Sequence, residues 1–377
     1  MKSVLLYYPF KLAENANSGS KLRPKKIYSA FQEWGSENGI EILLLSGSSS
    51  ERQTQFNSLR AEGKLDDLLF CYMENQTIPF WLTDAGHIPK KPFIDLQVMK
   101  FLKRKKVPTG VFYRDVYWKF DELYSLKGIK KTVMKSIYRM EEKFYEKYCD
   151  IIFLPSDAMG QYVDINKRKV ALPPGGTENI DHESSLLITG NRVAVENREW
   201  KSNGMYVGGI NNDDYGLFLL LDALELANRD DKVCKLTVVC REDEYNNLPD
   251  NKKLRLSSLH VSVKHVSGNA LNDLYKEMDY AFIPRFKSTY NDFSVPVKLV
   301  EYLSNELPVV ATNCAAQRDI IESDSYGIIC EDNAASMAEA IEVMSEQSAQ
   351  FRANIQATFT EKHSWKSRVE RIKESLL

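Results

Sequence analysis

The chain has 377 residues, which is more than a single typical hydrophobic core accommodates and therefore indicates two domains. Its 43% hydrophobic and 27% charged residues are typical of a globular protein in water, and its net charge of −2 argues against a general nucleic-acid binder. No apolar run is long enough for a signal peptide or a membrane span. Six scattered cysteines without a C-x-x-C pair predict reduced core residues in a cytoplasmic protein, and no metal site is expected.

The first half alternates predicted strands and helices, which indicates an α/β fold with a mainly parallel, doubly wound sheet. The loop after the first strand carries Gly19, Ser20 and Arg23, and we expect a helix that opens at Pro24 and runs through Trp34. Strand, small-residue loop and helix form the layout of a ligand loop. A single glycine makes this signal weak, and an ordinary surface loop is the more usual explanation. The stretch SGSSSER further on is interpreted as a polar turn.

The stretch YRDVYWKF directly follows a strand predicted at VPTGVFY. Ligands of open α/β sheets bind beyond the carboxyl ends of the strands, and charged and aromatic side chains suit a carbohydrate there. Asp115 could orient or deprotonate an acceptor hydroxyl, and Arg114 could bind an anionic group. The alternative is a structural ion pair between Arg114 and Asp115 under an aromatic lid.

Two predicted helices of this half are rich in lysine and arginine. Residues 93–105 form an amphipathic helix that runs into the basic sequence KRKK, and residues 126–150 form a long charged helix. Together they could contact an anionic membrane surface peripherally. A solvated charged face is the usual explanation of such a pattern.

A Pro-Pro-Gly-Gly break separates two α/β patterns, so we predict a first domain at 1–173 and a second at 174–361. In the second domain Arg241 and Arg285 each follow an apolar run closely and should emerge at the carboxyl edge of the sheet. The guanidinium group matches phosphate oxygens well. Arg241 could instead pair at the surface with an acidic neighbour, Glu242 or Asp243.

The stretch SVPVKLVEYLSNELPVVAT begins at Ser294 and predicts a helix followed by a short buried strand. A helix whose first turn has no acidic side chain leaves N–H groups available to an anion, here beside Val297 and Lys298. Glu301, one turn further, can accept hydrogen bonds from the paired hydroxyls of a sugar. Phosphate at the helix start and ribose at Glu301 suit a nucleotide diphosphate. An ordinary helix–strand unit with a surface glutamate remains the alternative.

The segment PVKLVEYLSNELPVVAT resembles the donor-site segment of family 4 glycosyltransferases, in the subgroup with a P-x-K-x-x-E-Y pattern. The resemblance implies the GT-B fold, in which two Rossmann-like domains face a cleft. The second domain would bind the nucleotide-sugar, the first would bind the acceptor with the Gly19 loop at the cleft, and a final helix at 362–377 would cross back. Further helices are expected at 315–323 and from 365 through 376.

The sequence departs from the family pattern at two places. Of the family's Glu-x7-Glu pair, only the second glutamate is matched, by Glu301, which the resemblance makes the ribose ligand. The first falls on Phe293, and neighbouring Asp292 is the candidate substitute. The family's phosphate-binding arginine and lysine have no counterpart, because Gly209 and the NNDD run occupy that region.

We therefore expect a glycosyltransferase of EC 2.4 type that needs neither a metal nor a cofactor. It would move a sugar from a nucleotide-diphosphate donor to a glycan or lipid-linked acceptor with retention of configuration. By analogy it would act in bacterial surface polysaccharide assembly, in the cytoplasm or at the inner face of the membrane. A non-catalytic nucleotide-sugar-binding subunit and a sugar-nucleotide epimerase on the same fold remain alternatives.

Overall fold

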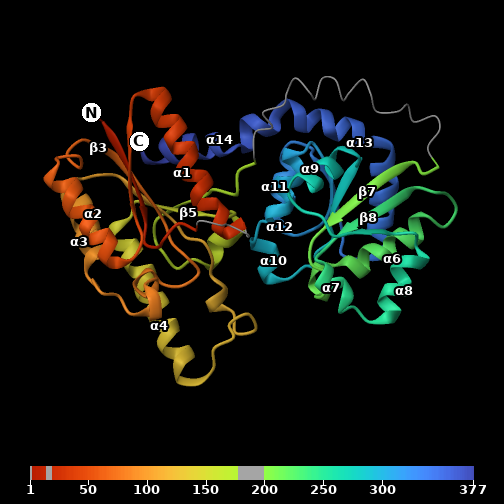
Figure 1. The fold of residues 1–377 in the computed structure, drawn as a ribbon, viewed down its shortest axis with the longest axis horizontal. Helices are drawn as coiled ribbons and strands as arrows, with labels where there is room; N and C mark the ends of the chain where they lie inside the picture. Colours follow the sequence, from red (N-terminus) through yellow and green to blue (C-terminus); the bar gives the residue numbers. More distant parts are fainter. Residues whose placement is uncertain (1, 14–18, 177–198) are drawn as a thin grey trace. The chain divides into compact units, whose positions relative to one another are not determined.

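The computed structural model describes residues 2–13, 19–176 and 199–377. Contacts divide the chain into two compact units (Figure 1). The first unit is Met1–Gly175 together with Trp365–Leu377, and the second is Gly176–Ser364. The predicted boundaries at 173/174 and 361/362 lie close to these.

The first unit is built on a parallel sheet of six strands in the order β2-β1-β3-β4-β5-β6. The strands are β1 (Ser3–Tyr8), β2 (Glu41–Ser46), β3 (Leu68–Glu74), β4 (Thr109–Phe112), β5 (Ile151–Leu154) and β6 (Arg168–Ala171). Every residue of β1, β4 and β5 is buried, as expected of parallel strands covered on both faces. The strand order changes direction between β1 and β3, so the carboxyl ends of these strands are where a ligand is expected.

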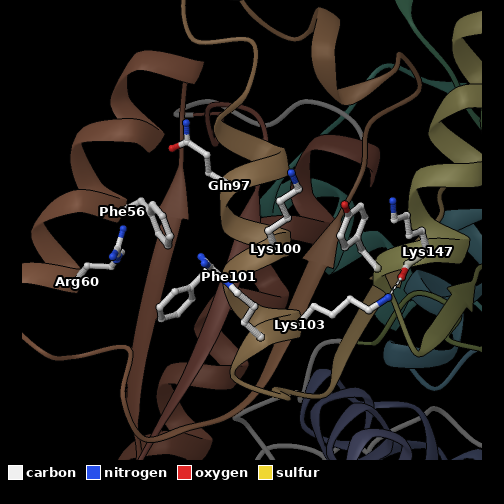
Figure 2. Close-up of a pocket in the computed structure, with 9 residues that line it drawn as sticks. Phe56, Arg60, Gln97, Lys100, Phe101, Lys103 and Lys147 are labelled. Carbon is white, nitrogen blue, oxygen red and sulfur yellow. Dashed lines mark hydrogen bonds between the residues drawn. The ribbon is translucent and has the colours of Figure 1, made fainter.

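The helices of the first unit are α1 (Gly19–Asn38), α2 (Ser49–Ala61), α3 (Ile94–Arg104), α4 (Gly128–Tyr148) and α14 (Trp365–Leu376). A surface hollow lies between the ends of α2, α3 and α4 (Figure 2). Helix α14 packs into the core of the first unit, where Val369 and Ile372 are completely buried. Arg368 of this helix donates through Nε to the carbonyl of Pro173 at 2.9 Å.

Helix α1 begins at Gly19, so the predicted start at Pro24 is wrong. Pro24 is the sixth residue of α1, where proline removes the intrahelical hydrogen bond of its N–H and its ring crowds the preceding turn. The apolar face that follows, Ile27, Phe31 and Trp34, is buried in the core and favours the helical path of the whole segment.

The second unit also has a parallel sheet of six strands, in the order β12-β11-β10-β7-β8-β9. The strands are β7 (Ser202–Val207), β8 (Cys234–Val239), β9 (Ser262–Lys264), β10 (Tyr280–Ile283), β11 (Val309–Thr312) and β12 (Gly327–Cys330). Counted from β7, this is the Rossmann order 3-2-1-4-5-6, and the direction reverses between β7 and β10. The predicted fold class, two Rossmann-like α/β domains, is confirmed.

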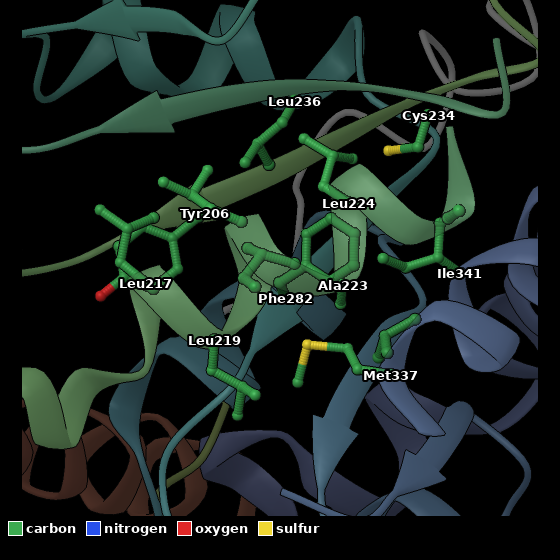
Figure 3. Packing of buried hydrophobic residues seen from close by; sticks show 14 of the residues in the cluster. Tyr206, Leu217, Leu219, Ala223, Leu224, Cys234, Leu236, Phe282, Met337 and Ile341 are labelled. Atoms are coloured by element: carbon green, nitrogen blue, oxygen red, sulfur yellow. The ribbon is translucent and has the colours of Figure 1, made fainter. Parts of the chain in front are cut away.

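Helices cover the second sheet on both faces, as the two separate buried apolar clusters of this unit show. The helices are α6 (Leu217–Ala227), α7 (Glu242–Asn246), α8 (Asp250–Ser258), α9 (Asn269–Lys276), α10 (Thr289–Phe293), α11 (Val297–Ser304), α12 (Ala315–Ser323) and α13 (Ala334–His363). Figure 3 shows side chains of α6 such as Leu219 and Ala223 packing with Met337 and Ile341 of α13. The helices predicted at 315–323 and from 365 through 376 are confirmed.

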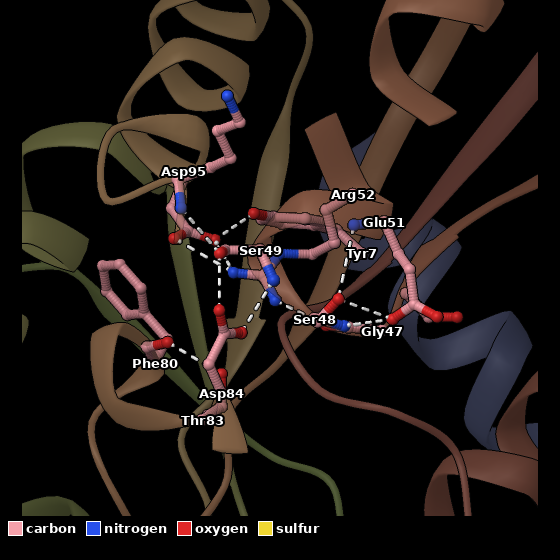
Figure 4. Close-up of polar contacts among 12 residues, drawn as sticks. Tyr7, Gly47, Ser48, Ser49, Glu51, Arg52, Phe80, Thr83, Asp84 and Asp95 are labelled. Carbon is pink, nitrogen blue, oxygen red and sulfur yellow. Dashed lines mark hydrogen bonds and ion pairs between the residues drawn. The ribbon is translucent and has the colours of Figure 1, made fainter. Parts of the chain in front are cut away.

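A buried polar network fixes the carboxyl edge of the first sheet (Figure 4). Arg52, 1% exposed, forms an ion pair with Asp95 at 3.0 Å and donates to the carbonyl of Gly47 at 2.6 Å. Asp95 also accepts a hydrogen bond from the Tyr7 hydroxyl. The segment predicted as a polar turn is therefore the start of α2, with a capping box between Ser48 and its third helical residue.

Candidate functional site

In the second unit, the loops that follow β7 and β10 meet at the point where the strand order reverses. Gly216 has a φ of +74°, and a Cβ there would lie 1.8 Å from the carbonyl oxygen of Pro284. Phe286 donates its N–H to the carbonyl of Asp214 at 3.4 Å. Only glycine permits so close an approach with this backbone conformation. The two loops thus form one surface at the carboxyl edge.

Helix α11 follows the loop after β10 in the sequence, and it begins directly after Pro296. Its first turn contains no acidic residue, and no side chain caps its start. Val297 is 41% exposed. The first N–H groups of a helix lack intrahelical partners and carry a partial positive charge. The helix start therefore has the features on which the anion-site prediction depends, and anion binding itself stays a prediction.

Glu301 is held by two neighbours, one on each carboxylate oxygen. The Tyr275 hydroxyl donates to Oε1 at 2.7 Å, and Lys298 Nζ contacts Oε2 at 2.9 Å. Burial raises the pKa of Tyr275, and Tyr302 and Glu301 raise it further, so the hydroxyl stays protonated and remains a donor. The Glu301 side chain is 34% exposed. It is oriented but still accessible, and its oxygens have lone pairs left for further donors.

Arg285 lies between β10 and α10, and its guanidinium group donates hydrogen bonds to other residues of the second unit. It donates to the side chains of Asn291, Ser294 and Gln317 at 3.2 to 3.3 Å. It also donates to the carbonyls of Asn291 at 3.2 Å and Ser294 at 3.0 Å. Desolvation by burial lowers its pKa. Arg285 thus braces the loop that leads into α11, and its predicted role as a phosphate ligand stays a prediction.

Arg241 and Asp292 are the other charged residues that the sequence singled out in this unit, and their surroundings differ. Arg241 is 79% exposed and lies 4.0 Å from Glu244, so its surface partner is this residue rather than Glu242 or Asp243. Asp292 accepts the N–H of Ala315 at 2.8 Å, at the start of α12. The proposed substitute for the family's first glutamate therefore already bonds to the main chain.

In the first unit, Glu74 at the end of β3 lies between two arginines. Arg23 Nε is 3.2 Å from its Oε1, and Arg114 Nη2 is 3.4 Å from its Oε2. The Tyr72 hydroxyl donates to Oε1 at 2.8 Å, and the Arg23 guanidinium lies 3.6 Å from the centre of the Phe112 ring. Burial lowers the pKa of Arg114, an effect that Glu74 opposes. Two arginines therefore share one buried carboxylate at the carboxyl edge of the sheet.

The sequence did not single out Glu74, although an acidic residue that ends an apolar strand was a usable signal. It did single out Arg23 in the ligand loop and Arg114 as an anion-binding residue, and the structure brings these two together on the same carboxylate. Gly19 and Ser20 lie in the first turn of α1, and their side chains are outside the described residues.

Asp115 bonds within its own loop, where its Oδ1 accepts the N–H of Tyr117 at 2.9 Å. The aromatic residues around it are mostly core residues. Tyr113 and Trp118 are buried, and Trp118 stacks on Tyr138 with ring centres 4.9 Å apart. The expected sugar-stacking surface is thus largely the interior of the loop, and Tyr117 is the more exposed ring of the three.

Within the described residues, no group of three or more His, Cys, Asp or Glu side chains could hold a metal ion. In the same part of the chain, no helix is both long and apolar enough to cross a bilayer.

The six cysteines are free and buried. Burial raises the pKa of the Cys240 and Cys234 thiols to about 11.

Comparisons with known proteins agree with this architecture. Residues 201–347 match the family model described as Glycosyl transferases group 1. Alr3699/HepE from Anabaena, solved in complex with UDP, is 14% identical over 100% of this chain and 99% of its own, with a TM-score of 0.58. Sucrose-phosphate synthase from Thermosynechococcus elongatus is 12% identical over 99% and 98%, with a TM-score of 0.56. A glycosyltransferase from Rickettsia africae is 14% identical over 100% and 98%, with a TM-score of 0.55.

No curated protein matches the sequence. The similarity to these structures shows that the chain has the GT-B fold. Within its second unit, residues 201–347 match the Glycosyl transferases group 1 model, so the predicted resemblance to this family is confirmed.

Proposed function

We propose that the chain transfers a sugar from a nucleotide-diphosphate donor, bound to the second unit, to a glycan or lipid-linked acceptor, bound to the first. The observation that carries this proposal is the position of Glu301 one turn after the uncapped start of α11, with Tyr275 and Lys298 holding its oxygens. The UDP complex of the Anabaena protein supports a nucleotide donor for this chain.

In this proposal the ribose hydroxyls donate to Glu301 and the diphosphate accepts from the first N–H groups of α11. These N–H groups and the arginines stabilise the departing diphosphate, so the mechanism uses no metal. Asp115 orients the acceptor hydroxyl, and Arg114 binds an anionic group of the acceptor. Retention of the anomeric configuration follows from the family resemblance.

The proposed setting is bacterial surface polysaccharide assembly in the cytoplasm, with peripheral membrane contact through the basic helices of the first unit. Helix α4 supports this contact, because Ile129, Val133 and Met140 are 84%, 52% and 58% exposed. Their spacing places them on one face of the helix.

The donor proposal is tested by thermal shift with UDP-, GDP- and dTDP-sugars, since a ligand that binds the native state raises the midpoint. Glu301→Ala should lose about 1.5–3 kcal/mol of nucleotide binding, the value of a charge-assisted hydrogen bond. Glu322→Ala is the matched control, because Glu322 is exposed on α12 of the same unit. Unchanged nucleotide affinity in folded Glu301→Ala protein would contradict the proposal.

A non-catalytic nucleotide-sugar-binding subunit is the second candidate. It is favoured by one observation: Phe293, at the position of the family's first glutamate, is 2% exposed, and neighbouring Asp292 bonds to the main chain of α12. Slow hydrolysis of the nucleotide-sugar without acceptor would identify a catalyst, whereas binding without turnover would identify the subunit. Analysis of the sugar product separates an epimerase from both.

A further inference from the structure

The surface hollow between α2, α3 and α4 has a volume of about 610 Å³ and is strongly basic (Figure 2). We call it the basic pocket, and its charged lining residues are Arg60, Lys100, Lys103, Arg104 and Lys147. No aspartate or glutamate lines it. A volume of this size lies in the range of ligand-binding pockets.

The cations of the basic pocket are not neutralised by the protein. Within the described residues, none of the five lies within 4.0 Å of a carboxylate oxygen. Other lysines of the same unit are paired: Lys105 contacts Asp66 at 2.9 Å and Lys135 contacts Asp121 at 2.6 Å. In a chain with a net charge of −2, five unpaired cations around one hollow favour an anionic ligand.

Aromatic rings line the same hollow. Phe56 and Phe101 meet edge to face at 5.6 Å, and the Arg60 guanidinium is 5.6 Å from each ring centre. Tyr148 has Lys103 5.6 Å and Lys147 5.4 Å from its ring centre. Aromatic rings beside cations suit a ligand that combines an apolar ring face with negative groups.

Cations at helix carboxyl ends also interact favourably with the helix dipole, which is the ordinary explanation of such residues. Lys103 Nζ donates to the carbonyl of Lys147 at 2.8 Å and fits that explanation. Arg60, Lys100 and Arg104 have no comparable bond to a carbonyl within the described residues. The dipole therefore does not account for the whole cluster.

The basic pocket lies away from the carboxyl edge of the first sheet. Helices α2, α3 and α4 each end shortly before the strand that follows, so their last turns lie at the amino edge of that sheet. Glu74 and its two arginines lie at the opposite edge. A strand of four to seven residues spans roughly 13–23 Å, which separates the two positions.

We propose that the basic pocket binds an anionic saccharide, namely a carboxylate- or phosphate-bearing segment of the acceptor glycan, at a second site remote from the transfer reaction. This rests on the proposed function only in taking the acceptor to be a glycan. The concave shape and the aromatic lining favour a saccharide over the flat surface of a membrane. The site would raise affinity for a long acidic acceptor and leave the chemical step unchanged.

The test uses a fluorescent heparin-derived hexasaccharide as an acidic probe and a dextran hexasaccharide as a neutral one. The double variant Lys100→Ala/Arg104→Ala removes two exposed cations of the basic pocket. The matched control is Lys127→Ala/Lys130→Ala, which removes two exposed lysines near the start of α4 in the same unit. The pocket variant should bind the acidic probe about tenfold more weakly, as expected for two partly exposed charge contacts. The control should change binding less than twofold, and dextran should not bind.

Equal losses in the two variants would overturn the proposal, because they would indicate general electrostatic attraction. It would also be overturned if vesicles of 30% phosphatidylglycerol in phosphatidylcholine lost binding in the pocket variant while the acidic probe did not, since the basic pocket would then serve a membrane. Nucleotide-sugar thermal shifts are measured on the same samples. If these shifts are absent while probe binding persists, the proposed function fails and the saccharide site stands.

Discussion

Glu141 gives the first unit a pH dependence that a single substitution should remove. It is completely buried on α4, where its Oε1 accepts the N–H of Phe80 at 2.9 Å and the hydroxyl of Tyr145 at 2.9 Å. Burial raises the pKa of Glu141 to about 8 from its ordinary 4.5, although both hydrogen bonds lower it. Glutamine preserves the accepting oxygen and cannot ionise, so Glu141→Gln isolates the charge.

The sign of the effect follows from the raised pKa. A carboxyl whose pKa is higher in the folded state contributes stability that is fully present below pH 4.5 and lost as the pH rises through about 8. The interval is roughly 3.5 pH units, and each unit corresponds to about 1.4 kcal/mol. The free energy of unfolding of the first unit should therefore fall by on the order of 5 kcal/mol, relative to Glu141→Gln, between pH 4.5 and pH 8.5.

The measurement is urea unfolding at pH 4.5, 6.5 and 8.5, followed by tryptophan fluorescence. Four of the five tryptophans, Trp34, Trp81, Trp118 and Trp365, belong to the first unit, so the signal reports mainly this unit. Glu146→Gln, on the same helix but partly exposed, is the control. If the difference between wild type and Glu141→Gln is the same at all three pH values, Glu141 does not titrate in this interval and the reasoning fails.

Three further predictions concern the proposed transfer reaction. Arg285→Ala should lower the thermal midpoint, because the hydrogen bonds to Asn291, Ser294 and Gln317 are lost. If the variant loses as much affinity for the nucleoside as for the nucleotide diphosphate, the role of Arg285 is purely structural. Asp115→Asn should lower turnover by roughly 10²–10⁴ with unchanged nucleotide affinity; full activity in a stable variant would remove Asp115 from the acceptor site. EDTA should leave turnover unaltered, and a loss restored by a divalent ion would disprove the metal-free mechanism.

The fold could be predicted from the sequence because the sequence patterns that indicate it are local. Apolar strands alternating with helices, the Pro-Pro-Gly-Gly break and the capping residues each act over a few positions. The helix at 315–323 was predicted with its exact bounds for this reason. The segment SGSSSER was misinterpreted although its capping-box spacing was visible, since the burial of Arg52 depends on Asp95 on another helix.

The site of the first unit could be predicted only in part, because its partners are distant in sequence. Glu74 is 51 residues from Arg23 and 40 from Arg114. These residues meet only because β3 lies between β1 and β4, and strand order is a property of the whole sheet. The sequence predicted that both arginines lie at strand or helix ends, but no local sequence pattern indicates which carboxylate they share.

In the proposed function, the start of α11 takes over the task of the family's missing arginine and lysine. Lys298 is paired with Glu301, and Arg285 holds the loop before the helix. A carboxylate offers about four acceptor positions, so ribose hydroxyls can add to Glu301 without displacing Lys298 or Tyr275. In the proposed function the N–H groups of α11 then contact the phosphates directly, and Arg285, besides stabilising the diphosphate, fixes where that helix begins. This division predicts that nucleotide binding depends more on the geometry of the helix start than on any single exposed cation.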